Sequence, residues 1–400
     1  MNMHVPHRHI PASLDEDRFE RESGEVYLTG NQALIRVMFD QKRRDARAGL
    51  KTGFFVTGYP GSPLGGMDGA LRSLRPLMQQ YDILHRPAQN EEFAATSLMG
   101  TQMLDEHPHP DFDGVVGFFY GKGPGVDRAI DAMKHGNFGG TSRHGAVVIL
   151  SGEDHEAKSS SIPYQQEFVF EHVGIPVLYP ASVAEFLEFG HHAIAMSRYS
   201  GCWVALKLVA QICEGGETVL LRPDHPRIRI PDYEVNGKPY AKKADFKFFP
   251  IVNVAQEREL YYDRHGAVRA YARANGLDRI VVRSDHDRVG IIAAGKSYTD
   301  ARQALHDLGF DEAGLRAAGI RLLKLGLIAP VEPQIVEEFA AGLDEIVVIE
   351  EKFACASAAD SVRRSPCHAA PAITAKKDDI GTVVPSSPPT ASRIPPIPIK

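Results

Sequence analysis

The chain has 400 residues, of which 43% are hydrophobic and 24% are charged, and its formal net charge is −6. These proportions are ordinary for a globular protein with a large core, and the length suggests two or three domains. The mild negative charge gives no reason to expect nucleic acid or an acidic membrane surface as a partner. No stretch approaches the roughly 18 consecutive apolar residues of a membrane helix, and the polar N-terminus lacks the apolar core of a secretion signal. We therefore expect a cytoplasmic protein.

Composition divides the chain into five parts. Residues 1–24 are polar and are expected to be mobile, whereas residues 25–225 alternate helices with strands without a break. Residues 226–285 form a charged, irregular connecting segment, and the α/β pattern resumes over residues 286–353. Residues 354–400 contain eight prolines and no aromatic residue. Such a segment cannot bury enough apolar surface to offset the entropy of ordering, so it is expected to be disordered.

In the first α/β part, short apolar strands alternate with helices, which predicts a parallel sheet with helices on both faces. Asn90 and Ser182 are expected to cap two of the helices, Ser182 together with Glu185 as a capping box. The predicted strands cover 53–57, 115–120, 146–152, 176–180 and 202–208, and the predicted helices cover 31–48, 67–80, 91–105, 126–137 and 183–198. Ligands of such folds bind in loops beyond the carboxyl ends of the strands.

Three loops at predicted strand ends are rich in glycine and polar residues: GYPGSPLGG (58–66), YGKGPG (120–125) and SGEDHEAKSSS (151–161). Glycine lets a backbone approach a ligand closely, although two of these loops are equally well explained as tight turns. YGKGPG is not a dinucleotide fingerprint, because Arg128 stands where the third glycine is required. The polar residues of the third loop have no known metal-ligand spacing, and a solvated loop is the alternative there.

Glu91 begins the helix predicted after Asn90. A carboxylate in that position is stabilised by the helix dipole by about 0.3–1 kcal/mol. A general preference for acidic residues in the first turn is therefore the simpler explanation of Glu91, taken by itself.

Two other patterns point to chemistry less strongly. GIIAAGKS (290–297) has the spacing of a phosphate-binding P-loop, but the residues between its glycines are apolar and are predicted to form a strand. Nucleotide binding stays open as an alternative, which loss of Mg-ATP binding in Lys296→Ala would support. The cysteines form no C-x-x-C pair, so they encode neither a zinc ribbon nor an iron–sulfur cluster. Cys202 lies in an apolar run and is interpreted as a packing residue.

Several stretches together resemble the N-terminal portion of indolepyruvate ferredoxin oxidoreductase, in its long fused-subunit form. The resemblance runs from about residue 22 to residue 352. It is carried by ESGEVYLTGNQALIRVMFDQKRRDARAGLKTGFFVTGYPGSPLGG, QNEEFAAT, GFFYGKGPGVDRAIDAMKHGNFGGTSRHG, EDHEAKSSS, GIPVLYP and AMSRYSGCWVALK.

The resemblance implies an enzyme that uses thiamine diphosphate to decarboxylate aryl 2-oxoacids oxidatively, with coenzyme A as acyl acceptor and ferredoxin as electron acceptor. It implies that residues 25–225 are a pyrimidine-binding domain and that residues 286–353 are a small transketolase C-terminal-like domain. The P-loop spacing would then be coincidental. In the family, a glutamate hydrogen-bonds the aminopyrimidine ring and promotes deprotonation of the thiazolium C2, and Glu91 occupies its place.

The resemblance also implies the other site residues. Those expected at the cofactor, besides Glu91, are Gly58, Tyr59, Pro60, Gly61 and Ser62. Those expected at the substrate are Ser62, Lys122, His155 and Ser159. No residue of this chain is expected to bind a metal.

The sequence departs from the family in what it lacks. There is no Gly-Asp-Gly motif for the diphosphate and Mg²⁺, no domain derived from a second subunit, and no cysteine pattern for [4Fe–4S] clusters. We therefore expect a truncated or frame-shifted fragment with little activity alone. The alternative is a working subunit, in a homodimer or beside a partner chain that supplies the missing parts.

Overall fold

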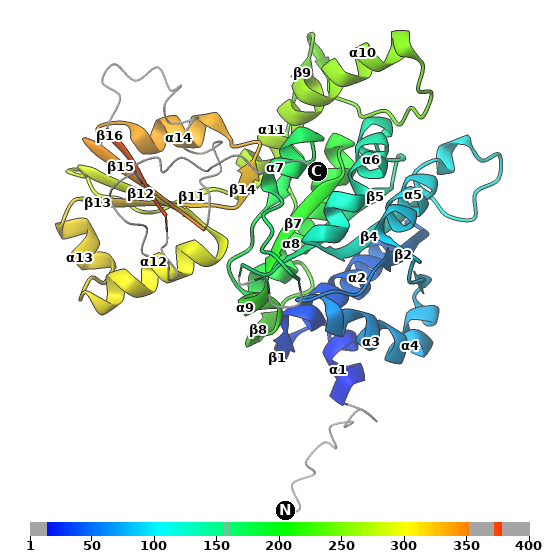
Figure 1. The fold of residues 1–400 in the computed structure, drawn as a ribbon, viewed down its shortest axis with the longest axis horizontal. Coiled ribbons are helices and arrows are strands. Elements are labelled where there is room, and N and C mark those ends of the chain that lie inside the picture. The colour runs from blue at the N-terminus through cyan, green and yellow to red at the C-terminus, as the bar shows by residue number, and fades with distance from the viewer. Residues whose placement is uncertain (1–13, 156, 158–159, 352–371, 378–400) are drawn as a thin grey trace, which may run out of the picture.

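The computed structural model describes residues 14–155, 157, 160–351 and 372–377, and it contains two α/β units that lie side by side (Figure 1). The larger unit is built on a seven-stranded sheet and the smaller on a five-stranded sheet. Parallel sheets flanked by helices were predicted, and the fold class is confirmed.

The large sheet has the strand order β14-β6-β7-β5-β4-β2-β3. Its strands are β2 (Thr52–Gly58), β3 (Ile83–His85), β4 (Gly114–Lys122), β5 (Ala146–Glu153), β6 (Val177–Leu178), β7 (Val204–Val209) and β14 (Leu327–Ala329). All neighbours pair in parallel except β14, which pairs antiparallel with β6. Every residue of β5 and β7 is buried, as expected for central strands that are covered on both faces.

Two helix pairs pack beside this sheet, α2 with α8 and α5 with α6. The helices of this part are α1 (Leu14–Glu20), α2 (Gly30–Arg47), α3 (Gly65–Ser73), α4 (Arg75–Gln80), α5 (Glu91–Thr101), α6 (Gly123–Gly139), α7 (Glu167–His172), α8 (Val183–Ser200) and α9 (Ala210–Cys213), with the 3-10 turn η1 (Leu104–Glu106). The single helix predicted over 67–80 is wrong, because the chain breaks at Leu74 and restarts with a proline in its first turn.

The loop predicted at GKGPG is also absent. Strand β4 continues through Lys122, and α6 begins at the next residue, Gly123. A proline in the first helical turn has no N–H to lose there, so Pro124 is compatible with the earlier helix start.

Strand β1 (Gly24–Thr29) pairs antiparallel with β8 (Gly216–Leu221). Strand β8 ends just before residues 226–285, the segment that was predicted to be irregular. That segment is ordered in part. It holds β9 (Glu234–Val235), β10 (Lys238–Pro239), α10 (Pro250–Arg258), the π-helical turn η2 (Glu259–Arg264) and α11 (His265–Asn275).

The small sheet has the order β11-β13-β12-β15-β16. Its strands are β11 (Arg279–Val282), β12 (Val289–Ala294), β13 (Ile320–Leu325), β15 (Glu345–Glu350) and β16 (Ala372–Lys377), and its helices are α12 (Gly295–Asp307), α13 (Glu312–Ala317) and α14 (Pro333–Ala340). The sheet thus begins before residue 286, and it includes six residues of the segment predicted to be disordered. The other residues of 354–400 lie outside the described residues.

The P-loop spacing has no loop to match it. Gly290 and the four residues after it belong to β12, as the sequence predicted, and α12 starts directly at Gly295. Lys296 pairs with Asp300 on the same helix. A phosphate cradle needs consecutive N–H groups freed in a turn between strand and helix, and the strand here uses them in pairing with β13 and β15.

Candidate functional site at the carboxyl edge of the large sheet

Three strand ends of the large sheet bring polar side chains into one cluster. Ser62 follows β2, Lys122 ends β4, and Asp154 follows β5. The Lys122 ammonium lies 2.8 Å from the Asp154 carboxylate and 3.2 Å from the Ser62 hydroxyl, and that hydroxyl also donates to Asp154. The Lys122 side chain is 10% exposed and that of Asp154 is 1% exposed. The cluster is a nearly buried ion pair with a hydroxyl held against it.

Glu91 lies at the same edge, in the first turn of α5. The Asn90 side chain caps this helix by accepting a hydrogen bond from the Phe93 amide, at 2.9 Å, so the predicted cap is confirmed. The Glu91 carboxylate is directed at the start of α6, because a β-carbon built on Gly125 would lie 2.3 Å from its Oε1. The positive end of the α6 dipole faces this negative charge.

The glycine-rich loop after β2 approaches β4 closely. A β-carbon on Gly58 would lie 2.0 Å from the carbonyl oxygen of Tyr120, and one on Gly61 would lie 3.0 Å from Cβ of Lys122. No other residue fits at Gly58 without moving the backbone. Tyr59 is 45% exposed and Pro60 is also exposed, so this loop presents its ring side chains to solvent.

A second polar network joins β3 and β4 to α3. The Tyr120 hydroxyl donates to Asp68 at 3.0 Å and lies 3.0 Å from Nε2 of His85. Arg72 pairs with the other Asp68 oxygen at 2.9 Å. Burial raises the pKa of Tyr120 and lowers that of His85, so both side chains are neutral near pH 7.

His155 does not join Lys122, although both were predicted at the substrate. Its ring lies 3.7 Å from Glu153 and 3.6 Å from Glu351, a residue of the small unit. Lys207 lies at the centre of this group and pairs with Glu153, Glu167 and Glu351. Ser159 lies outside the described residues.

Sequence reasoning therefore missed Lys207 and gave Asp154 no role. The signal for Lys207 was present, since a lysine in the middle of an apolar strand must find buried carboxylates. Which carboxylates it finds depends on the contact between the two units, and that contact has no local pattern.

Substituting Gly125 with alanine tests the position of Glu91. The new β-carbon would meet the carboxylate at 2.3 Å, so we expect the free energy of unfolding to fall by about 1–3 kcal/mol. Gly100→Ala on α5 is the matched control, because nothing lies within 4 Å of its β-carbon and a helix gains about 0.5–1 kcal/mol from this change. Urea denaturation measures both. Equal stability of the two variants would contradict the placement of Glu91.

The described residues contain no group of three or more histidine, cysteine or acidic side chains able to hold a metal ion. They also contain no helix long and apolar enough to cross a membrane.

The chain is similar in sequence to one protein family and to several known proteins. Residues 278–357 match the family model described as "Indolepyruvate ferredoxin oxidoreductase middle domain". The chain is 23% identical over 333 residues to "Indolepyruvate oxidoreductase subunit IorA" of Methanothermobacter thermautotrophicus, covering 83% of this chain and 47% of that protein. It is 24% identical over 338 residues to the subunit of the same name from Pyrococcus abyssi, covering 83% and 46%. The predicted resemblance to indolepyruvate ferredoxin oxidoreductase is confirmed. The chain spans about half the length of these relatives.

Solved structures support the fold. A 2-oxoglutarate:ferredoxin oxidoreductase from Magnetococcus marinus, with 2-oxoglutarate, coenzyme A and succinyl-CoA bound, matches with a TM-score of 0.63 at 14% identity. The match covers 88% of this chain and 62% of that one. A split-gene transketolase, described as an inactive β4 tetramer, matches with a TM-score of 0.52 at 12% identity, covering 88% and 89%.

Proposed function

We propose that this chain supplies the pyrimidine-binding half of a thiamine-diphosphate-dependent 2-oxoacid:ferredoxin oxidoreductase, acting on an aryl 2-oxoacid such as indolepyruvate. The observation that carries the proposal is the position of Glu91. It lies at the carboxyl edge of a parallel sheet, where such folds bind ligands, and against the start of α6. The segment before its helix contacts the glycine-rich loop after β2, because the Ala88 amide donates to the Gly58 carbonyl.

The residues present fit the ring end of the cofactor. Glu91 is partly exposed, so a ring nitrogen can reach its carboxylate. Gly58 brings the loop backbone against β4, and Tyr59 offers an exposed aromatic face beside it. These are the elements that a flat, hydrogen-bonding heterocycle requires.

The proposal assigns no residue of this chain to the diphosphate end of the cofactor, because the sequence has no Gly-Asp-Gly motif. A diphosphate with Mg²⁺ takes carboxylate, amide and carbonyl oxygens. The second half of the relatives, or a partner chain, is therefore proposed to supply the Mg²⁺ site, the [4Fe–4S] clusters and the contacts to coenzyme A and ferredoxin.

The site residues of this chain have separate roles in the proposed reaction. Thiamine diphosphate, when bound, supplies the carbon nucleophile and the electron sink for decarboxylation. Glu91 hydrogen-bonds the ring and holds the proton that activates it. Lys122 and Ser62 present an ammonium and a hydroxyl to the substrate carboxylate, while Asp154 orients both of them through the contacts given above.

Reconstitution tests the proposal. The chain is assayed for reduction of ferredoxin that depends on indolepyruvate and coenzyme A, first alone and then with the complementary half of a relative added as a separate chain. We expect no turnover from either part alone and turnover from the mixture that requires thiamine diphosphate. Turnover of the mixture without the cofactor, or a mixture that binds the cofactor and stays inactive, would contradict it.

A further inference from the structure

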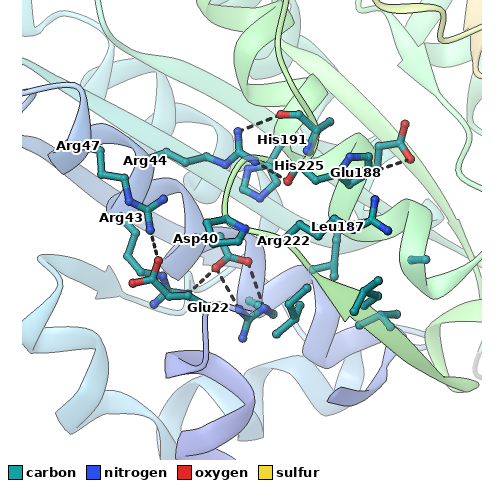
Figure 2. A pocket seen from close by; sticks show the side chains of 17 residues that line it. Glu22, Asp40, Arg43, Arg44, Arg47, Leu187, Glu188, His191, Arg222 and His225 are labelled. Carbon is teal, nitrogen blue, oxygen red and sulfur yellow. Dashed lines mark hydrogen bonds and ion pairs between the residues drawn. The ribbon is translucent and has the colours of Figure 1, made fainter. Parts of the chain in front are cut away.

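A separate polar cavity lies on the outer side of the helix pair α2 and α8 (Figure 2). Its volume is about 250 Å³, and it is bordered by the end of β8 and by the residues that follow it, 222–226. Neither Glu91 nor Lys122 lines it. The cavity therefore belongs to neither the candidate site nor the proposed function.

The cavity carries an excess of positive charge. Three carboxylates line it: Glu22, Asp40 and Glu188. Five guanidinium groups line it as well: Arg36, Arg43, Arg44, Arg47 and Arg222. Burial, and after it the charge of Arg44, lowers the pKa of the lining His191 well below its usual value, so His191 is neutral. Two positive charges remain in excess when the other histidine is also neutral.

Three of the arginines have acidic partners, but only two carboxylates serve them, so one of the three positive charges is not offset. Asp40 binds both Arg36, at 3.1 Å, and Arg43. Glu22 binds Arg47. Two donors among these groups, Nε of Arg36 and Nη1 of Arg43, are buried and make no hydrogen bond within the described part of the chain.

The other two arginines form no ion pair with a carboxylate in the described residues, although the charges of Asp40 and Asp224 act on Arg44. Arg44 donates to the backbone carbonyls of His225 and Pro226, which are uncharged, and so holds segment 222–226 over the cavity. The Arg222 side chain is exposed, and the residues that the structure describes give it no hydrogen bond or ion pair. The remaining carboxylate, Glu188, faces His225 and Arg279 instead.

We propose that this cavity binds a small organic phosphate ester. The two guanidinium groups that form no such ion pair match the two negative charges of a phosphate monoester, and the planar fork of arginine fits phosphate oxygens in pairs. Apolar residues also line the cavity and suit an organic group attached to the phosphate. They are Ala184, Leu187, Val219, Leu220, Leu221, Pro223 and Pro226.

Calorimetry on the full chain with phenyl phosphate and with inorganic phosphate tests this site. Phenyl phosphate is expected to bind and to bind more tightly than inorganic phosphate, and added salt is expected to weaken both. Arg222→Gln is expected to weaken phenyl phosphate binding about tenfold or more, because it removes a charged hydrogen-bond donor. The Arg222 side chain is exposed and makes no hydrogen bond or ion pair with the described residues, so this variant is expected to keep the fold.

Arg288→Gln is the matched control, because Arg288 is also an exposed arginine and pairs with Asp344 outside the cavity. It is expected to bind as the unchanged protein does. Absence of phosphate binding at millimolar concentration, or unchanged binding in Arg222→Gln, overturns the proposal. Equal affinity for inorganic phosphate and phenyl phosphate overturns the assignment of an organic ester.

Discussion

Replacing Lys207 with methionine is expected to lower the free energy of unfolding by about 3–5 kcal/mol. Methionine keeps the length and most of the volume of the side chain, so the change removes mainly the charge. Lys207 is 4% exposed and pairs with Glu167, with Glu153 at 3.5 Å and with Glu351 at 3.4 Å. Its loss leaves three almost buried carboxylates facing one another.

Lys207 offsets the burial of Glu153, whereas burial and the charge of Glu153 together raise the pKa of Glu167. Burial lowers the pKa of Lys207, but the three carboxylates more than offset it, so this pKa lies well above its usual value. Burial raises the pKa of Glu153, but Lys207 and His155 outweigh it and the net shift is downward. The Tyr179 hydroxyl also donates to both oxygens of Glu351, at 2.5 and 2.7 Å. The cluster therefore links the two units through charge as well as packing.

The pH dependence distinguishes this cause from lost packing. Without Lys207 the carboxylates have folded-state pKa values above their unfolded ones, so the destabilisation is present above about pH 4.5 and disappears as falling pH protonates them. We expect the stability of Lys207→Met to approach that of the unchanged protein near that pH. A deficit that stays constant from pH 7 down to pH 4.5 would show that packing is the cause.

Lys296→Met provides the control for this variant. Lys296 also pairs with a carboxylate, Asp300, but the two side chains are 29% and 53% exposed. Surface pairs of this kind contribute about 0–1 kcal/mol, so a small change is expected. Urea unfolding of both variants at several pH values makes the comparison.

Local patterns in the sequence are enough to predict most of the large sheet. The apolar runs at β4, β5 and β7 and the caps at Asn90 and Ser182 each have a cause within a few residues. Ser182 accepts from the Glu185 amide at 3.2 Å, whereas the Glu185 side chain accepts from Ala181 instead of closing the predicted capping box. The patterns thus locate the helix start, and packing decides the partner of Glu185.

Pairings between distant segments have no such local signal. Strand β14 is short and crosses to the large sheet, and β8 pairs with β1 across almost two hundred residues. Both were missed because strand pairing depends on which edges are free once the rest has folded. The same holds for the site: the loop 58–62 and Glu91 were proposed from the resemblance, while the contact of Lys122 with Asp154 rather than His155 is a result of the strand order.

Glu91→Gln is expected to reduce turnover about 10²–10⁴-fold in the reconstituted enzyme, which is the usual contribution of a general acid or base. Glutamine keeps the size of the side chain and can hydrogen-bond, but it cannot hold the proton in the role proposed for Glu91. The first turn of α5 keeps its cap, because Asn90 and not Glu91 accepts from the Phe93 amide. The free energy of unfolding should therefore change by less than about 1 kcal/mol.

The neighbouring Glu92 makes this a controlled comparison. Glu92 is exposed in the same helical turn, so Glu92→Gln removes the same charge from the same helix end without touching the start of α6. If the dipole interaction alone explains Glu91, the two variants will share a small loss of stability and keep turnover. If Glu91 acts on the cofactor ring, only Glu91→Gln loses turnover, and the loss will appear in kcat while both proteins unfold at the same urea concentration. Retained turnover in Glu91→Gln would remove this residue from its proposed role and leave the carboxylate as a helix-stabilising charge.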